Sequence, residues 1–238
     1  MRAALSVVAL LVGCGHDASE ALHDAGPADP LSIARVAQFG FEGTLADEST
    51  GKQATCVAGK CPTFVAGKHG MAVQFDGAAQ CLQFAVQGMA GPTFTVALWM
   101  NEASDGRYAI ISKPFHATTT DNDSWQLETD TPRAFGFSTA NAGRHDYMWL
   151  GSAVTPGVWQ HVAITWDGSL KRIYVDGSLA ESLADPDPVQ WDATSPMIGC
   201  DYGGGALGYF YPGAIDDVVV YDRALSDAEI AQLSNLAQ

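Results

Sequence analysis

The chain has 238 residues, of which 12 are basic and 27 acidic, so its formal net charge is −15. This acidity opposes binding to nucleic acid and to anionic lipid, and neither is an expected partner. Hydrophobic residues make up 47% of the chain and charged residues only 16%, which excludes an intrinsically disordered protein and supplies enough apolar side chains for a large core.

The N-terminus predicts export. Arg2 precedes an apolar run that ends in Leu-Val-Gly-Cys at Cys14. A bilayer-spanning helix needs about 18 or more apolar residues, so residues 1–13 are predicted to be a secretory signal peptide. The last four residues resemble a bacterial lipobox. This resemblance implies cleavage before Cys14, attachment of diacylglycerol to its sulfur and, since Gly15 follows, transfer to the outer membrane. An ordinary signal peptide with an incidental cysteine is the alternative.

A flexible tether is expected after the signal peptide. Residues 14–34 begin with the lipidated cysteine and continue as a small, acidic, proline-bearing segment without apolar periodicity. Such a segment cannot bury a face. One folded domain is therefore expected over residues 35–238, held to a bacterial membrane by the lipid and exposed at the outer membrane or cell surface.

The sequence pattern over most of this domain predicts short β-strands separated by turns. Apolar and polar side chains alternate over 94–101 and over 161–166, which is the period of a strand. Asp-Gly pairs accept the positive φ of hairpin turns, and two of them divide 159–182 into a three-stranded meander. Further strands are expected at 71–75, 81–85, 107–113, 124–129, 134–139, 145–151, 197–200 and 213–221.

One helix is predicted near the C-terminus. Ser226 and Glu229 form a capping-box pattern, and Ile230, Leu233 and Leu236 follow at helical spacing. Many short strands, frequent turns and one terminal helix predict an all-β fold, an antiparallel β-sandwich with a short C-terminal helix packed on a sheet.

The remaining cysteines predict two disulfides. Once Cys14 carries lipid, four cysteines are left in an exported chain, and four allow three pairings. Cys56 and Cys61 flank a short turn, so we expect them to pair, which leaves Cys81 for Cys200. A metal site built from the four is disfavoured because no Cys-x-x-Cys spacing occurs.

Several segments, in order, resemble the laminin-G-like jelly rolls of the concanavalin A-like lectin/glucanase superfamily. They are FGFEG at 39–43, GMAVQFDG at 70–77, FTVALW at 94–99, WQHVAITWDG at 159–168, IYVDG at 173–177, FYPGAIDDV at 210–218 and YDRALS at 221–226. The resemblance covers about 35–236 and implies a jelly roll. It is much more specific for the fold than for the ligand.

The resemblance also implies a calcium ion near the sheet edge. Asp216 is in phase with neighbouring valines, so its carboxylate is expected to face a buried side, where it must be paired, hydrogen-bonded or bound to a metal. Asp47 lies in the loop after the opening strand, and Glu42 and Asp76 are the next candidate ligands. The alternative is that Asp216 caps backbone amides in a turn.

The carboxylates do not predict catalysis. Retaining glycoside hydrolases need two carboxylates about 5–5.5 Å apart, and the related glucanases place theirs in a Glu-x-Asp-x-x-Glu run. The chain has no such run: Glu128 and Asp130 share a face, but a third carboxylate is missing. His161 has no serine elbow to serve, since Gly-x-Ser-x-Gly is absent. We expect no catalytic residues.

Aromatic side chains are the candidate ligand contacts. Tyr147 and Trp149 share one face of a predicted strand, and Tyr211 is a third candidate, whereas Trp125 is expected in the core. The glycine-rich loop at 202–206 either shapes a binding rim or merely turns. The expected function is that of a non-catalytic surface lipoprotein that recognises a glycan and is stabilised by calcium. A protein-binding adhesion module and a glycoside hydrolase relative are the alternatives.

Overall fold

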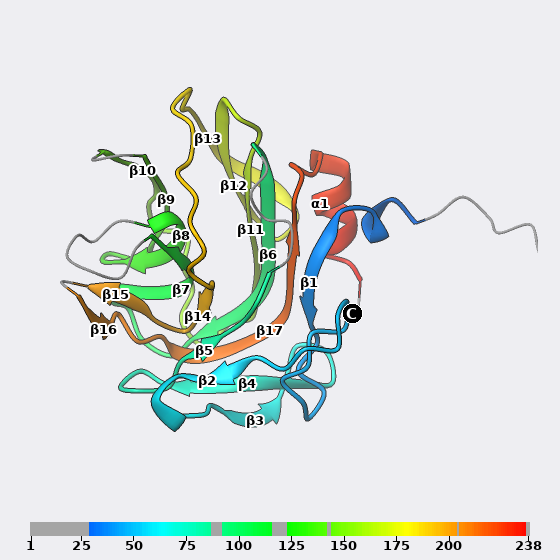
Figure 1. Cartoon of the computed structure of the whole chain (residues 1–238), viewed down its shortest axis with the longest axis vertical. Coiled ribbons are helices and arrows are strands. Elements are labelled where there is room, and N and C mark those ends of the chain that lie inside the picture. The colour runs from blue at the N-terminus through cyan, green and yellow to red at the C-terminus, as the bar shows by residue number, and fades with distance from the viewer. Residues whose placement is uncertain (1–28, 87–91, 116–122, 142–143, 204, 237–238) are drawn as a thin grey trace, which may run out of the picture.

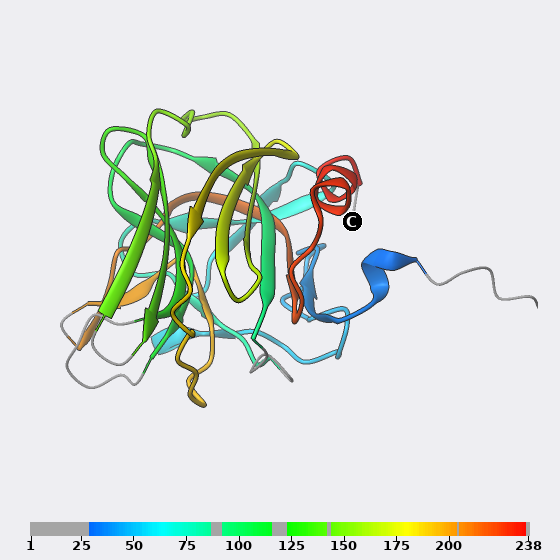
Figure 2. The same cartoon turned by 90° about the horizontal axis from the view of Figure 1, so that it is seen from above.

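Two antiparallel sheets stack face to face in the computed structural model, which describes residues 29–86, 92–115, 123–141, 144–203 and 205–236 (Figures 1 and 2). A single short α-helix lies against the outer side of one sheet. The predicted fold class is confirmed, and every strand segment expected from the sequence contains a strand of the structure.

The larger sheet has eight strands. Its order is β13-β12-β11-β6-β17-β4-β3, and β1 also pairs with β17. The strands are β1 (Arg35–Phe39), β3 (Thr63–Ala66), β4 (Met71–Asp76), β6 (Phe94–Glu102), β11 (Gln160–Trp166), β12 (Leu170–Val175), β13 (Ser178–Ala184) and β17 (Pro212–Tyr221).

The other sheet has seven strands in the order β10-β9-β8-β7-β14-β5-β2, and a separate hairpin, β15–β16, lies near it (Figure 1). These strands are β2 (Thr55–Cys56), β5 (Leu82–Gln83), β7 (Tyr108–Pro114), β8 (Asp123–Asp130), β9 (Ala134–Asn141), β10 (Arg144–Leu150), β14 (Met197–Ile198), β15 (Asp201–Gly203) and β16 (Ala206–Gly208). The helices are η1 (Pro30–Ser32), η2 (Val57–Gly59) and α1 (Asp227–Leu233).

The main core fills the space between the two sheets. Alternate side chains of β6, from Phe94 to Met100, and Trp125 and Leu127 of β8 are buried there. Burying a large apolar side chain stabilises the fold by about 1.5–3 kcal/mol, so this layer dominates the driving force for folding. Trp125 was predicted to lie in the core and does so.

Helix α1 covers a second, smaller apolar layer on the outer side of the eight-stranded sheet. Ser226 and Glu229 form the predicted capping box. Ile230 and Leu233 pack on outward-facing side chains of the sheet, and the Tyr174 hydroxyl donates to Asp227 at 2.8 Å. Among the described residues, no helix has both the length and the apolar character needed to cross a membrane.

The domain begins earlier than predicted. Leu31 of η1 is buried against the same outer layer, and its carbonyl accepts a hydrogen bond from the Tyr221 hydroxyl at 3.0 Å. Residues 30–34 therefore belong to the folded domain, and the boundary predicted at 34/35 is wrong by a few residues. The apolar pattern missed this because Leu31 and Ile33 are too few to show a period. The signal peptide and the rest of the tether, with Cys14, lie outside the described residues.

Both expected disulfides are present. Cys56 pairs with Cys61 across η2, and Cys81 pairs with Cys200, 119 residues away in the chain. Cys200 directly precedes β15, so the second disulfide links this hairpin to the start of β5.

A β-bulge in β17 changes the side on which Asp216 lies. Asp216 pairs with Trp99 of β6, and the register shifts before Val219, with Asp217 at φ 48°. Ile215 and Val218 both face the main core, so Asp216 faces the opposite side of the sheet. The prediction that Asp216 and Val218 face the same side of the sheet is wrong, because the extra residue of the bulge breaks the two-residue period of the strand.

Candidate functional site

Polar and aromatic side chains meet on the outer face of the seven-stranded sheet, in two rows that run across β10, β9 and β8. Tyr147 is in register with Ser138 and Gln126, and Trp149 is in register with Gly136 and Glu128. The next residues along β8, Trp125 and Leu127, point the other way into the core. Strand alternation therefore directs the first set outward.

The two predicted aromatic residues of β10 form a parallel pair. The Tyr147 and Trp149 rings stack with their centroids 5.7 Å apart and an angle of only 6° between their planes. The two residues remain 37% and 41% exposed. Exposed aromatic rings offer an apolar surface against which the apolar side of a ligand can pack.

Gly136 allows Trp149 to lie across the sheet. A Cβ atom at position 136 would be 2.5 Å from Cζ3 of Trp149 and 2.9 Å from Cγ of Glu128. Only a residue without a side chain leaves room for both neighbours. The glycine thus places the indole next to the carboxylate of Glu128, and the sequence alone did not indicate this role.

Glu128 and Arg107 supply the charges of this face. Nε of Arg107 lies 3.2 Å from Oε2 of Glu128, and the guanidinium also lies over the Tyr209 ring, 5.0 Å from its centroid. Burial raises the pKa of Glu128 to about 7, and the ion pair with Arg107 counteracts that shift. The carboxylate is buried while the guanidinium is partly exposed, so Arg107 is the member of the pair that a ligand can reach.

A small cavity of about 190 Å³ opens beside the stacked rings. Gln126 and Asp201 are joined across it by a hydrogen bond of 3.0 Å between Nε2 and Oδ2. Tyr202 lies in β15 and Tyr209 just after β16, and both line the cavity with Arg107. Tyr202, the first residue of the glycine-rich segment, therefore borders this site, which favours the binding-rim alternative.

Three polar atoms near this face are buried without hydrogen-bond partners. Ser124 Oγ, Ser138 Oγ and Glu128 Oε1 form no hydrogen bond to any described residue. Because all three are closed to solvent, a ligand on this face does not reach them. The polar groups that a ligand can reach are Arg107, which is partly exposed, and Gln126, which lines the cavity.

The prediction that Tyr211 contacts the ligand is wrong. Its side chain is completely buried in the main core. Burial raises its pKa well above the usual value, and the nearby carboxyl of Glu102 adds to the shift. The sequence did not separate Tyr211 from Tyr147, because the burial of Tyr211, which directly precedes β17, depends on contacts that only the folded chain makes.

The four predicted calcium ligands do not come together. Asp216 accepts hydrogen bonds from the amides of Lys68 and His69, Asp47 accepts from the amide of Gln38, and Asp76 from three amides of the turn that follows it. These three carboxylates thus accept backbone amides, and Asp216 caps the amides of the turn after β3, as the alternative for Asp216 proposed. Glu42 likewise accepts from the amide of Met71. Calcium binding stays a prediction without a defined site.

A different acidic group lies at the edge where β10 and β13 approach. Within the part of the chain that the structure describes, Asp146, Asp185 and Asp187 are the one set of three whose ligand atoms lie within 4.8 Å of one another. The fully buried ammonium of Lys171 lies 2.9 Å from Oδ2 of Asp185 and donates to the carbonyl of Asp146. A lysine thus provides the positive charge that a metal would otherwise supply.

Comparison with known proteins agrees with this architecture. Residues 76–231 match the family model described as the concanavalin A-like lectin/glucanases superfamily, in its laminin G group. A search of curated proteins gave no match.

Solved structures share the fold at low sequence identity. The binding domain of Paraclostridial Mosquitocidal Protein 1 superimposes with a TM-score of 0.66 and 15% identity, covering 86% of this chain and 52% of that one. Domain 4 of AbnA, an extracellular arabinanase from Geobacillus stearothermophilus, was solved with arabinotriose; its TM-score is 0.65, its identity 16%, and the match covers 84% of this chain and 98% of that domain.

A third structure, the ligand binding domain of botulinum neurotoxin serotype D, was solved with N-acetylneuraminic acid. It has a TM-score of 0.64 and 15% identity, covering 84% of this chain and 50% of that one. This chain thus spans about half the length of the toxin chains that it matches. On the family match and the fold together, the chain belongs to the laminin G group of the concanavalin A-like lectin/glucanase superfamily.

Proposed function

We propose that this protein is a non-catalytic glycan-binding module, and that the glycan lies on the outer face of the seven-stranded sheet. The observation that carries the proposal is the parallel, exposed pair of Tyr147 and Trp149 beside the Arg107–Glu128 ion pair. The rings take the C–H face of a sugar, while Arg107 and Gln126 take its hydroxyl groups.

Two neighbouring folds support a saccharide as the ligand. Domain 4 of AbnA was solved with arabinotriose and the serotype D toxin domain with N-acetylneuraminic acid. Another toxin binding domain was solved with rat synaptotagmin II, so a protein partner is the outcome to test against. The small cavity beside the exposed rings favours the glycan, because small ligands bind in cavities whereas protein interfaces are broad.

Trp149→Ala should weaken glycan binding about tenfold or more. Losing one stacking surface removes of the order of 1.4 kcal/mol of binding free energy, which is a factor of ten in Kd. The measurement is a glycan array with the full chain, followed by calorimetric titration of the best glycan. Phe64→Ala is the matched control, since Phe64 is an aromatic residue of similar exposure on β3 of the other sheet.

Gly136→Ala tests the same face without removing a contact. The added Cβ would displace the Trp149 ring, so affinity should fall while the thermal unfolding curve keeps its cooperative shape. Equal binding by wild type, Trp149→Ala and Gly136→Ala would contradict the assigned face. Release of reducing sugar from the bound glycan would contradict a non-catalytic module, and Glu128→Gln would then identify the acid.

We also propose that the protein is exported and anchored by a lipid on Cys14. The lipobox resemblance of the first 14 residues supports this anchor. Cys14→Ser should move the protein from the detergent phase to the aqueous phase in a Triton X-114 partition of whole cells, because a thioether-linked diacylglycerol can no longer form. Ser19→Ala serves as the control. Retention of Cys14→Ser in the detergent phase would contradict lipidation.

A further inference from the structure

The turn between β3 and β4 is held in place by three carboxylates, two from β17 and one from the segment after β1. Oδ2 of Asp216 accepts the backbone amides of Lys68 at 2.9 Å and His69 at 3.1 Å. Oδ2 of Asp217 bonds Nδ1 of His69, and Oε1 of Glu42 accepts the amide of Met71 at 2.9 Å. The conformation of this turn is therefore specified by side chains from distant parts of the sequence.

Burying two adjacent carboxylates beside a backbone bulge costs folding free energy. We infer that the arrangement has a function beyond holding the turn. Asp216 and Asp217 are adjacent and both buried, and burial raises the pKa of Asp216 to about 6. Asp217 also adopts a positive φ of 48° at the β-bulge. A Cβ atom at Gly67 would lie 2.4 Å from Oδ2 of Asp216, so the glycine is needed for this close approach. Bulges often redirect side chains at functional sites.

The result is that Lys68 and His69 extend over a tryptophan on the outer face of the eight-stranded sheet. Nζ of Lys68 lies 4.1 Å from the centroid of the Trp99 ring. The ring of His69 meets Trp99 edge-on at 5.8 Å, and His161 meets it edge-on at 5.4 Å. Within the described residues, Lys68 forms no ion pair, although acidic residues outnumber basic ones 27 to 12.

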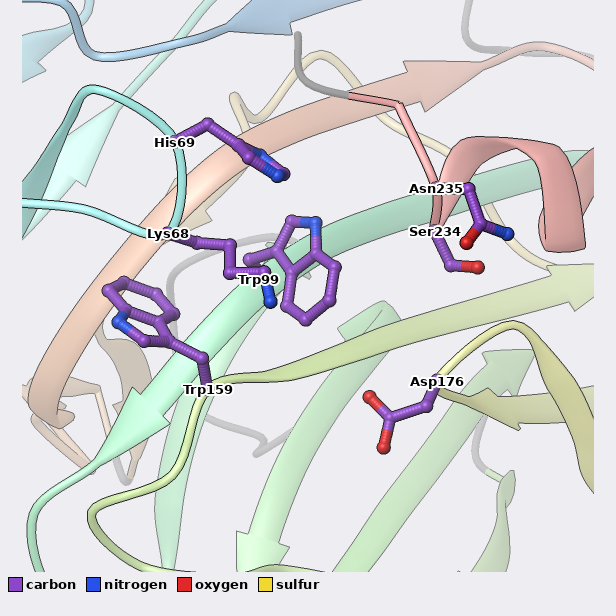
Figure 3. Close-up of a pocket in the computed structure, with 7 residues that line it drawn as sticks. All are labelled: Lys68, His69, Trp99, Trp159, Asp176, Ser234 and Asn235. Atoms are coloured by element: carbon purple, nitrogen blue, oxygen red, sulfur yellow. The ribbon is translucent and has the colours of Figure 1, made fainter.

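A cavity of about 540 Å³ opens beside this cluster. Figure 3 shows Lys68 and His69 entering it from one side and Asp176 from the opposite side, with Trp99 between them. Trp159 forms a further aromatic wall, and Asn235, which follows α1, adds an amide to the lining. Oδ1 of Asp176 accepts the amide of His161 at 3.0 Å, which holds its carboxylate in this position.

We propose that this cavity is a second binding site, and that it takes a saccharide unit bearing a carboxylate, of the uronic acid type. The sugar carboxylate binds the ammonium of Lys68, which has no anionic partner in the described part of the chain. Its hydroxyl groups donate to Asp176 and bond Asn235, and its C–H face lies against Trp159. The carboxylate of Asp176 opposes a ligand that is anionic at both ends, whereas it accepts hydroxyl groups well.

The site is separate from the Tyr147–Trp149 face, because it lies on the other sheet, on the side that carries α1. The inference therefore does not depend on the glycan-binding function proposed above, and each can fail alone.

The test follows the six tryptophans by ¹⁹F NMR of the full chain labelled with 5-fluorotryptophan. Trp99→Phe and Trp159→Phe assign the two resonances of the cavity. Galacturonate should shift the Trp159 resonance in a saturable way, and galactose and acetate should each bind at least tenfold more weakly. Lys68→Gln should weaken galacturonate binding tenfold or more, whereas Lys52→Gln, which removes another exposed lysine, should not change it.

Each arm can overturn a part of the proposal. If galacturonate moves neither resonance, or if Lys68→Gln binds it as wild type does, the site is wrong. Equal binding of galactose removes the role of the carboxylate, and equal binding of acetate removes the sugar. Trp149→Ala should leave the galacturonate shift of Trp159 unchanged, and its loss in that variant would show that only one site exists.

Discussion

Removing the Cys81–Cys200 disulfide should destabilise the domain by about 4–5 kcal/mol. The bond closes a loop across 119 residues, and the entropy that such a loop withdraws from the unfolded chain corresponds to about 5 kcal/mol. Typical domains have only about 5–15 kcal/mol of stability, so this loss is large. The double variant Cys81→Ala/Cys200→Ala avoids a free thiol, and guanidinium unfolding of the variant and the wild type gives the difference.

The Cys56–Cys61 pair provides the control for this prediction. Its sequence separation is 5, so the same loop argument gives only about 2 kcal/mol. Loss of Cys81–Cys200 should also weaken glycan binding, because Asp201 and Tyr202 follow Cys200 directly and border the candidate site. Equal destabilisation by the two double variants would show that loop length does not govern the effect.

Glu102→Gln should stabilise the protein at pH 8 by up to about 3 kcal/mol. Glu102 is fully buried in β6, and burial, aided by the nearby charge of Asp105, raises its pKa to about 7 from an ordinary value near 4.5. The folded state therefore holds this proton to higher pH than the unfolded state does. Each unit of such a difference is worth about 1.4 kcal/mol, and the neutral glutamine removes the penalty of ionisation.

The raised pKa of Glu102 fixes the direction in which the stability of the wild type changes with pH. Because the folded pKa is raised, wild-type stability should fall as pH rises from about 4.5 through 7, and Glu128 contributes in the same direction. Below pH 6.5 the buried His161 acts oppositely, since burial lowers its pKa to about 4. Thermal unfolding between pH 6.5 and 8 therefore isolates the carboxyl groups.

In that pH range the wild-type melting temperature should fall more steeply than that of Glu102→Gln. Glu181→Gln, on the exposed edge strand β13, is the matched control and should behave as the wild type does. A variant no more stable than wild type at pH 8 would mean that Glu102 is solvated or paired in solution.

Local patterns in the sequence were sufficient for the long strands and the α-helix, but not for β2, β3 and the β15–β16 hairpin, which no predicted segment covered. The alternation at 94–101 became β6, because a strand with one face in the core needs that period wherever it lies. The capping box at Ser226 required only residues within one turn. The disulfides followed from counting cysteines in an exported chain and from one short turn.

The chain by itself thus determined most of the strands, the helix, the cysteine pairs and the sandwich, because each depends on neighbours in sequence or on the need to bury an apolar face. Tertiary structure alone decided which aromatic side chains stay exposed: Tyr211 is buried and Tyr147 is not. Tertiary structure also placed the Asp216 side chain on the opposite side of the sheet from the predicted one, through a single bulge residue. Both candidate sites join segments far apart in the chain, as Arg107 and Glu128 show, and only sheet pairing brings such residues into contact.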